Sequence, residues 1–208
     1  MVRRRTGAVP RRLVILSLAS AGWSWGNAHA GSQAEERLAD SVRSALAAAI
    51  RDDPPPDPSS AFDVERRLAY RSWMVPTVQR LHQHKADLHT RLDFAQTLWY
   101  ETHRAGLETD LVLGLIEVES GFRKYAVSPA GAMGYMQVMP FWARTIGDGK
   151  ALRLFHTQTN LRFGCVILRH YLDTEKGDLF MALGRYNGSR GEVAYPKAVF
   201  AARERWRI

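Results

Sequence analysis

Glu119 is the residue whose type and position most clearly suggest chemistry. It stands near the end of a strongly apolar segment that reads DLVLGLIEVES over residues 110–120. On a helix, side chains three, four, seven and eight positions apart share a face, and the residues at these steps before Glu119 are Ile116, Leu115, Val112 and Leu111. Desolvation on such a face raises the pKa of a carboxyl group and suits it to act as a general acid near neutral pH. The alternative is a carboxylate at the helix end that reaches water or caps a neighbouring loop.

The chain after Glu119 is rich in glycine, methionine and polar groups, and reads ESGFRKYAVSPAGAMGYMQVMP. Its glycines can take positive φ angles that let backbone approach a ligand closely, or can form an ordinary turn, and its methionines suit either an apolar cleft wall or a core. A second segment, RYNGS at 185–189, contains Tyr186 and Asn187. Tyr186 suits either an apolar sugar surface or a buried helix position with a satisfied hydroxyl, and Asn187 suits a cleft or a helix cap.

Together, Glu-Ser, GxxGxMQ and Tyr-Asn-Gly in this order resemble the soluble lytic transglycosylases, whose catalytic domain shares the goose-type lysozyme fold. The resemblance covers about residues 87–208. It implies that Glu119 is the single catalytic acid and base, and that Ser128 hydrogen-bonds near its carboxylate or near the acetamido group of the substrate. The other residues implied to bind substrate are Gln137, Met139, Tyr186, Asn187 and Tyr195. Tyr135 departs from the family, which often has an aliphatic residue there, and this difference could change a contact in the cleft.

The reaction implied by the resemblance uses one carboxyl group, whereas most glycosidases use two. Glu119 would protonate the glycosidic oxygen of the β-1,4 bond between N-acetylmuramic acid (MurNAc) and N-acetylglucosamine (GlcNAc) in peptidoglycan. It would then deprotonate the C6 hydroxyl of the muramic acid, which attacks the anomeric carbon and gives a 1,6-anhydro sugar without water. No metal or organic cofactor is expected.

Two other functions remain open at this stage. A lysozyme-type hydrolase would need an added carboxylate to hold a water, and the nearest candidates in the sequence are Asp148, Asp178 and Glu192. A wall-binding or assembly-scaffold module would keep the cleft without turnover. Loss of the acid would favour that module, but Glu119 is present.

Residues 1–30 have the pattern of a secretory signal peptide. Five arginines precede an apolar run at 13–22, and the segment ends in Ala-His-Ala at 28–30. The apolar run of about ten residues is far shorter than the roughly twenty that span a membrane. We therefore expect cleavage after Ala30 and a periplasmic or secreted protein with no stable membrane span.

The net charge argues against a nucleic-acid partner. The formal charge is +8, and removing the five arginines of residues 1–30, which contain no acidic residue, leaves +3. A small, scattered positive charge is typical of loose association with an anionic cell wall rather than of a nucleic-acid surface. The expected partners are peptidoglycan glycan strands, and cell-wall or secretion-assembly proteins are further candidates.

Cys165 is the single cysteine, so the chain forms no internal disulfide. It belongs to an apolar helical pattern with Leu161, Leu168 and Tyr171, which indicates a buried structural thiol rather than a nucleophile. The spacing of Cys and His residues does not match that of a metal site.

Helical periodicity dominates the remainder, and an all-α fold is predicted: a lysozyme-like catalytic domain at 87–208 with an N-terminal helical extension at 31–86. The extension is expected to contain a helix capped by Ser32 and running to about Ile50, a proline-rich linker near 52–60, and helical structure broken at Pro76. Further helices are expected over 87–105, after a cap at Thr109 or Asp110, and from near residues 160, 178 and 192. Residues 141–159 have no assignment.

Overall fold

The fold is all-α in the computed structural model, which describes residues 33, 35, 38–51 and 63–208. The helices are α1 (Asp40–Ile50), α3 (Val64–Arg80), α4 (Leu88–Arg104), α5 (Thr109–Ser120), α6 (Pro140–Ile146), α7 (Thr157–Thr174), α8 (Leu179–Asn187) and α9 (Ala194–Trp206), with short 3-10 helices η1 (Leu81–Gln83) and η2 (Ala151–Phe155). Within these ranges the extended pairing is limited to isolated bridges in the loop between α5 and α6. The predicted fold class is confirmed, whereas the predicted signal peptide and proline-rich linker lie outside the described residues.

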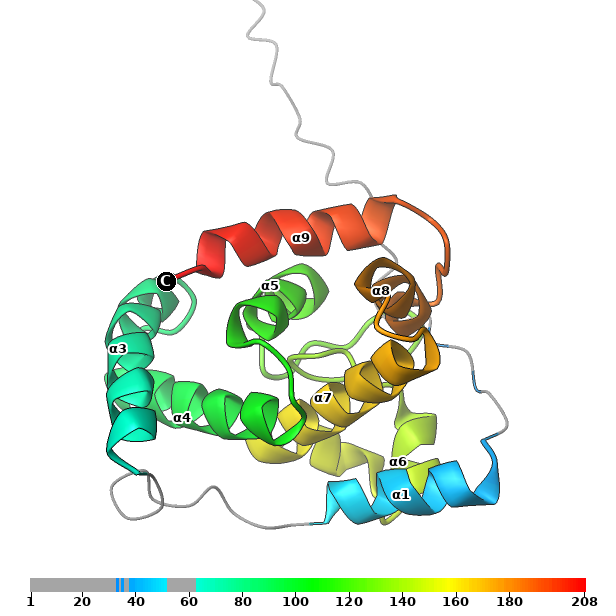
Figure 1. Cartoon of the computed structure of the whole chain (residues 1–208). Coiled ribbons are helices and arrows are strands. Elements are labelled where there is room, and N and C mark those ends of the chain that lie inside the picture. Colours follow the sequence, from blue (N-terminus) through cyan, green and yellow to red (C-terminus); the bar gives the residue numbers. More distant parts are fainter. Residues whose placement is uncertain (1–32, 34, 36–37, 52–62) are drawn as a thin grey trace, which may run out of the picture.

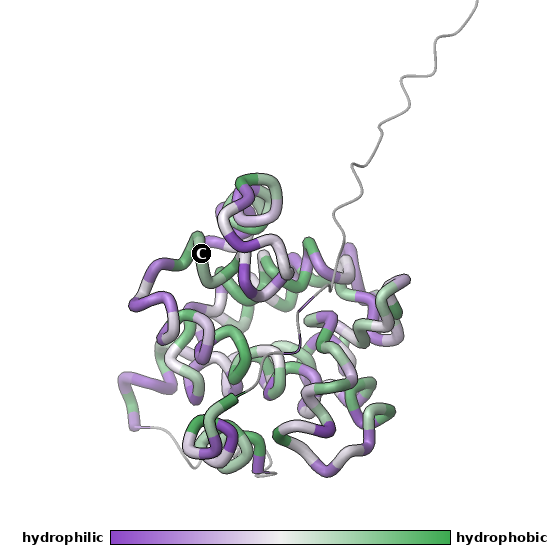
Figure 2. Tube along the Cα trace, turned by 90° about the vertical axis from the view of Figure 1, so that its right-hand side faces the viewer, coloured by the Kyte–Doolittle hydropathy of each residue, from purple (hydrophilic) through white to green (hydrophobic). Residues whose placement is uncertain are grey.

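Helix α5 forms the centre of the structure, with α9 on one side and α4 and α7 on the other (Figure 1). Most of its residues are buried, so neighbouring parts of the chain cover the helix on most sides. It packs most closely against α9 at Gly114, where a Cβ atom would lie 2.6 Å from the backbone nitrogen of Arg203. Figure 2 shows hydrophobic and hydrophilic residues alternating along the surrounding helices, as expected for helices with one buried side. None of the described helices is long and apolar enough to cross a membrane.

Three predicted helix boundaries were wrong. The first helix begins at Asp40, because Ala39 has extended backbone angles, and not near Ser32. Helix α3 continues through Pro76 to Arg80, since the burial of Trp73 and Val78 on either side of the proline outweighs its helix-breaking tendency.

The start of α5 also differs from the prediction. Its N-cap is Glu108, which makes no side-chain capping bond, and not Thr109 or Asp110. The carboxylate of Asp110 instead pairs with Arg203 of α9 at 3.1 Å, so it joins the two most closely packed helices. By contrast, Asp178 caps α8 by accepting a hydrogen bond from the backbone of Met181.

The N-terminal helices pack directly on the remainder of the chain. Helix α1 lies against α6 and α7, and α3 lies against α4. A buried guanidinium, that of Arg162 on α7, donates to the carbonyl oxygen of Arg51 at the end of α1 at 2.6 Å. It also forms an ion pair at 2.8 Å with Glu101 of α4, and both side chains are almost fully buried. Helix α1 is therefore fastened to the core through a polar contact as well as by apolar packing.

Candidate active site

Glu119 lies on the last turn of α5 and exposes 5% of its surface. Its Oε1 accepts a hydrogen bond of 2.5 Å from the hydroxyl of Tyr195, which lies on α9. Its Oε2 is buried and accepts no hydrogen bond from the described residues. Burial raises the pKa of Glu119 from 4.5 to about 8, and the hydrogen bond from Tyr195 offsets only part of this effect. The group is therefore protonated at neutral pH, as a general acid must be.

Two tyrosines lie near this carboxyl group. Tyr195 is 4% exposed, and burial together with the nearby charge of Glu119 raises its pKa well above its usual range, so it remains a hydrogen-bond donor. Tyr186 of α8 is fully buried, and its hydroxyl donates to the carbonyl oxygen of Met136 at 2.7 Å. Tyr195 thus contacts the predicted acid directly. Tyr186 supports the loop, and its contact with sugar stays a prediction.

The loop between α5 and α6 carries Ser128 and Gln137, and both organise its backbone. The Ser128 hydroxyl accepts from the backbone nitrogen of Ala132 at 3.0 Å and closes a turn. Gln137 has a φ of 49° and is buried, with its side-chain amide donating to the carbonyl oxygens of Ala126 and Gly134. Glu119 takes its hydrogen bond from Tyr195 and not from Ser128, and the roles of Ser128 and Gln137 toward substrate stay predictions.

The last two predicted site residues lie at helix ends. Met139 is the half-buried N-cap of α6 and packs against the core. Asn187 is the last residue of α8, is 5% exposed, and accepts a hydrogen bond from the Ser189 hydroxyl. Both positions are compatible with lining a cleft, and that role stays a prediction for each of them.

Asn160 of α7 holds the same loop and was missed in the sequence. Its Oδ1 accepts from the backbone nitrogen of Met136, and its Nδ2 donates to the carbonyl oxygens of Met133 and Leu154. Gly134 has a φ of 75°, and a Cβ there would lie 2.3 Å from Nδ2 of Asn160. The sequence did indicate an unusual position here, because Asn160 is a polar residue one helical turn before Gly164 on the otherwise apolar face of α7.

Gln33 reaches the site from before α1. It is 4% exposed, and its Oε1 accepts a hydrogen bond of 2.8 Å from the indole nitrogen of Trp142 on α6. It also interacts with the hydroxyl of Tyr186. No pattern in the sequence indicated this contact, since it joins residues more than a hundred positions apart.

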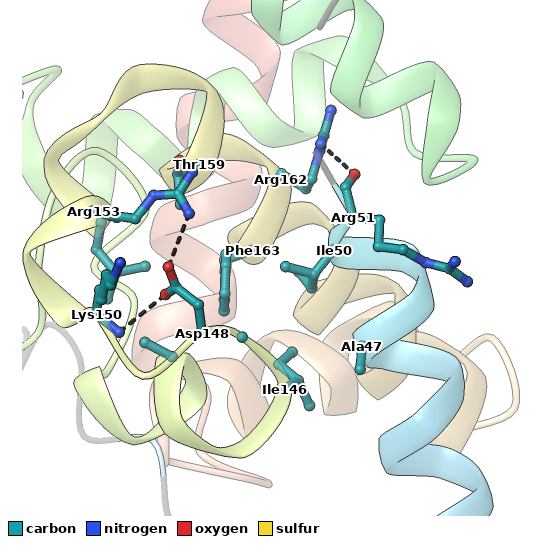
Figure 3. Close-up of a pocket in the computed structure, with 13 residues that line it drawn as sticks. Ala47, Ile50, Arg51, Ile146, Asp148, Lys150, Arg153, Thr159, Arg162 and Phe163 are labelled. Carbon is teal, nitrogen blue, oxygen red and sulfur yellow. Dashed lines mark hydrogen bonds and ion pairs between the residues drawn. The ribbon is translucent and has the colours of Figure 1, made fainter. Parts of the chain in front are cut away.

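The three carboxylates considered for a hydrolase have other partners or lie exposed. Asp148 pairs with Arg153 at 2.9 Å, which lowers its pKa, and borders a cavity of about 340 Å³ between α1, α6 and α7 (Figure 3). Asp178 caps α8, and Glu192 is exposed in the loop before α9. The interactions of these residues do not connect them to Glu119.

Cys165 is buried, and burial raises the pKa of its thiol well above the usual range, which agrees with a structural role. Among the residues that the structure describes, no group of three or more His, Cys, Asp or Glu side chains could hold a metal ion.

The chain is similar in sequence to a known domain family. The sequence model of the transglycosylase SLT domain matches residues 98–208. The chain belongs to the transglycosylase SLT domain family. This match confirms the resemblance found in the motifs, and it includes Glu119, the loop and both tyrosines.

Relatives of this SLT-domain chain include longer proteins. The membrane-bound lytic murein transglycosylase C of Actinobacillus pleuropneumoniae serotype 5b (strain L20) is 37% identical over 105 residues, covering 43% of this chain and 29% of that protein. The transglycosylase of Enterobacteria phage PRD1 is 34% identical over 100 residues, covering 46% and 36%. A solved structure of an inactive mutant of lytic transglycosylase Slt from Pseudomonas aeruginosa aligns with a TM-score of 0.48 and 21% identity, over 70% of this chain and 30% of that one. The chain thus spans about a third of the length of these relatives.

Proposed function

We propose that this protein is a peptidoglycan lytic transglycosylase that cleaves the MurNAc–GlcNAc β-1,4 bond without water and leaves 1,6-anhydro-MurNAc ends. The observation that carries the proposal is the protonated, buried carboxyl group of Glu119, held by Tyr195 on one oxygen. Membership of the SLT domain family supports the same reaction.

Glu119 supplies both proton transfers in this scheme. It gives its proton to the glycosidic oxygen as the bond from that oxygen to the anomeric carbon breaks, and the acetamido oxygen of the muramic acid stabilises the anomeric centre. The C6 hydroxyl oxygen then bonds to the anomeric carbon and its proton passes to the carboxylate, which restores the acid. The Oε2 atom, which accepts no hydrogen bond from the described residues, is the oxygen suited to these transfers.

The surroundings of Glu119 support a lyase over a hydrolase. A hydrolase needs a second group to position water, and the considered candidates Asp148 and Asp178 are engaged in a surface ion pair and a helix cap. The low exposure of Glu119 also favours exclusion of water from the anomeric centre. The predicted substrate-binding residues belong to this proposal: Ser128, Gln137, Met139, Tyr186, Asn187 and Tyr195.

Export and domain boundaries also remain part of the proposal. The arginine-rich, apolar pattern of residues 1–30 supports export to the periplasm or the medium. We place the catalytic domain at 87–208 and the extension at 31–86, with peptidoglycan strands as the substrate and cell-wall or secretion-assembly proteins as partners.

Mass spectrometry of the soluble products released from peptidoglycan tests the proposal. Residues 31–208 are expected to release 1,6-anhydromuramyl products, and Glu119→Gln is expected to release none. Glu117→Gln is the matched control, because Glu117 lies on the same helix but pairs with Arg205 and Trp206 of α9. Reducing-end products would instead indicate a hydrolase, and wall binding without release would indicate a binding module.

A further inference from the structure

Lys85 is a buried cation close to the end of the catalytic helix, in the connection between η1 and α4. It exposes 9% of its surface. Its Nζ donates to the carbonyl oxygen of Phe122 at 3.1 Å and to the hydroxyl of Tyr135 at 2.7 Å. The same nitrogen lies 4.3 Å from the ring centroid of Tyr135 and 5.0 Å from that of Phe94, within the range of cation–π attraction. Its hydrogen-bond acceptors are thus neutral oxygens, and aromatic rings surround it.

The ammonium group loses solvation in this position. Burial lowers the pKa of Lys85 to about 8, with a smaller contribution from the charge of Lys124. An exposed lysine would avoid this cost, since buried charges are unfavourable unless their hydrogen bonds compensate for lost water. The hydrogen bonds of Lys85 join two segments of the chain, the turn at Phe122 and the loop at Tyr135.

The first segment begins directly after the catalytic residue. Phe122 follows Glu119 by three positions and has a φ of 63°, a left-handed conformation that a bulky residue rarely adopts. The bond from Lys85 to its carbonyl oxygen holds this turn, and its ring packs on that of His84 at a centroid distance of 4.5 Å. Lys85 therefore restrains the backbone at the point where α5 ends.

The second segment is the loop that lies against the catalytic helix. Tyr135 is held at both ends, because its hydroxyl accepts from Lys85 and its carbonyl oxygen accepts from the hydroxyl of Ser120 at 2.7 Å. Its neighbour Met136 accepts the hydrogen bond of Tyr186. A continuous set of contacts therefore runs from Lys85 through Tyr135 to the residue beside Glu119 and to Tyr186.

We propose that Lys85 is a positioning residue, which clamps Phe122 and Tyr135 so that the end of the catalytic helix and the loop against it keep Glu119 in place beside Tyr195. This role explains why position 135 is a tyrosine, since an aliphatic residue there would offer Lys85 no hydroxyl. The Tyr135 side chain points into the core and not toward a substrate contact. The kinetic consequence of the proposal rests on the lytic transglycosylase function proposed above.

The test compares Lys85→Met and Tyr135→Phe with the unmutated protein, and uses Lys124→Met as a control that removes a nearby charge but neither hydrogen bond. Turnover of soluble, uncross-linked glycan strands gives kcat and KM. NMR titration of protein labelled with ¹³C at the glutamate carboxyl carbon gives the pKa of Glu119 without relying on activity.

We expect Lys85→Met to lower kcat about tenfold or more with KM changed by less than about twofold, because the acid is misplaced while sugar contacts remain. The pKa of Glu119 should fall toward 4.5 as water enters. Tyr135→Phe should cause a smaller loss in the same direction, because it leaves the bond from Lys85 to Phe122 intact. The double variant should be no worse than Lys85→Met alone, because Lys85→Met already removes the contact that Tyr135→Phe breaks. Lys124→Met should leave kcat and the pKa unchanged.

The proposal is overturned if both variants keep kcat and the pKa of Glu119 unchanged, even where their melting temperatures fall, because Lys85 would then serve stability alone. If Lys85→Met does not fold, Tyr135→Phe decides between the same outcomes. If the unmutated protein releases no product, the proposed function fails, and the NMR titration still decides the role of Lys85.

Discussion

Replacing Glu119 by glutamine is expected to stabilise the protein by an amount that grows as the pH rises from about 4.5 to about 8. Burial raises the pKa of Glu119 to about 8, so in this range the folded chain retains a proton that the unfolded chain has released. The free energy of unfolding of the unmutated protein therefore falls as pH rises through this range, and levels off above it. Glutamine carries no titrating proton and escapes this loss.

The size of the effect follows from the change in proton affinity. A tenfold change in affinity corresponds to about 1.4 kcal/mol, so the rise from 4.5 to about 8 corresponds to about 5 kcal/mol at pH 9. Water entry around the ionised carboxylate reduces the loss, and a gain of about 2 kcal/mol or more is expected for Glu119→Gln. The proposed catalytic acid is thus held at the expense of stability.

Urea unfolding between pH 4 and pH 9 measures this difference. The useful comparison is Asp148→Asn, because pairing with Arg153 lowers the pKa of Asp148 and gives the opposite sign. That variant should be less stable than the unmutated protein by a nearly constant amount from pH 5 to pH 9, because Asp148 is ionised in both the folded and the unfolded chain over this range. A stability difference for Glu119→Gln that stays constant from pH 4 to pH 9 would refute the buried, protonated state of Glu119.

Three further outcomes follow from the site. Tyr195→Phe removes a hydrogen bond that lowers the pKa of Glu119, so the alkaline limb of the pH–rate profile should move to higher pH and kcat should fall. Gly134→Ala places a Cβ against Asn160 at a φ of 75°, and chemical denaturation should show a loss of about 2 kcal/mol or more, whereas an unchanged midpoint would contradict the close packing. Cys165 should resist thiol reagents until denaturant unfolds the chain, and rapid labelling of folded protein would contradict its burial.

Local periodicity was enough to predict most of the helices and a carboxyl group on the apolar face of one of them, whereas the catalytic role of Glu119 came from the motifs and stays a prediction. Glu119 projects from the apolar face of its own helix, and its side chain is buried. Helix boundaries were predicted less well, because Pro76 lies inside a helix whose packing against α4 outweighs its local preference. Helices α6 and η2, within the unassigned residues 141–159, are short, and short segments carry little periodic signal.

The partners within the site depend on contacts between distant parts of the chain. Tyr195 was expected to touch substrate, and its bond to Glu119 exists because α9 crosses α5 at Gly114. Asn160 and Lys85 act through backbone carbonyl and amide groups of the loop, whose positions depend on the whole fold. Sequence spacing contains no such distances, so these roles could be found only in the structure.

The contacts of Arg162 with Arg51 and Glu101 determine where the chain can be truncated without loss of stability. The helical pattern and the family resemblance predicted a catalytic domain that begins near residue 87, separate from the N-terminal helices. Removing α1, however, would take away one partner of the buried guanidinium and admit water to its ion pair through the cavity of Figure 3. A fragment that begins at residue 87 loses α3 as well as α1 and should therefore unfold more readily than the longer chain. The N-terminal helices then belong to the same cooperative unit as the helices that follow residue 87.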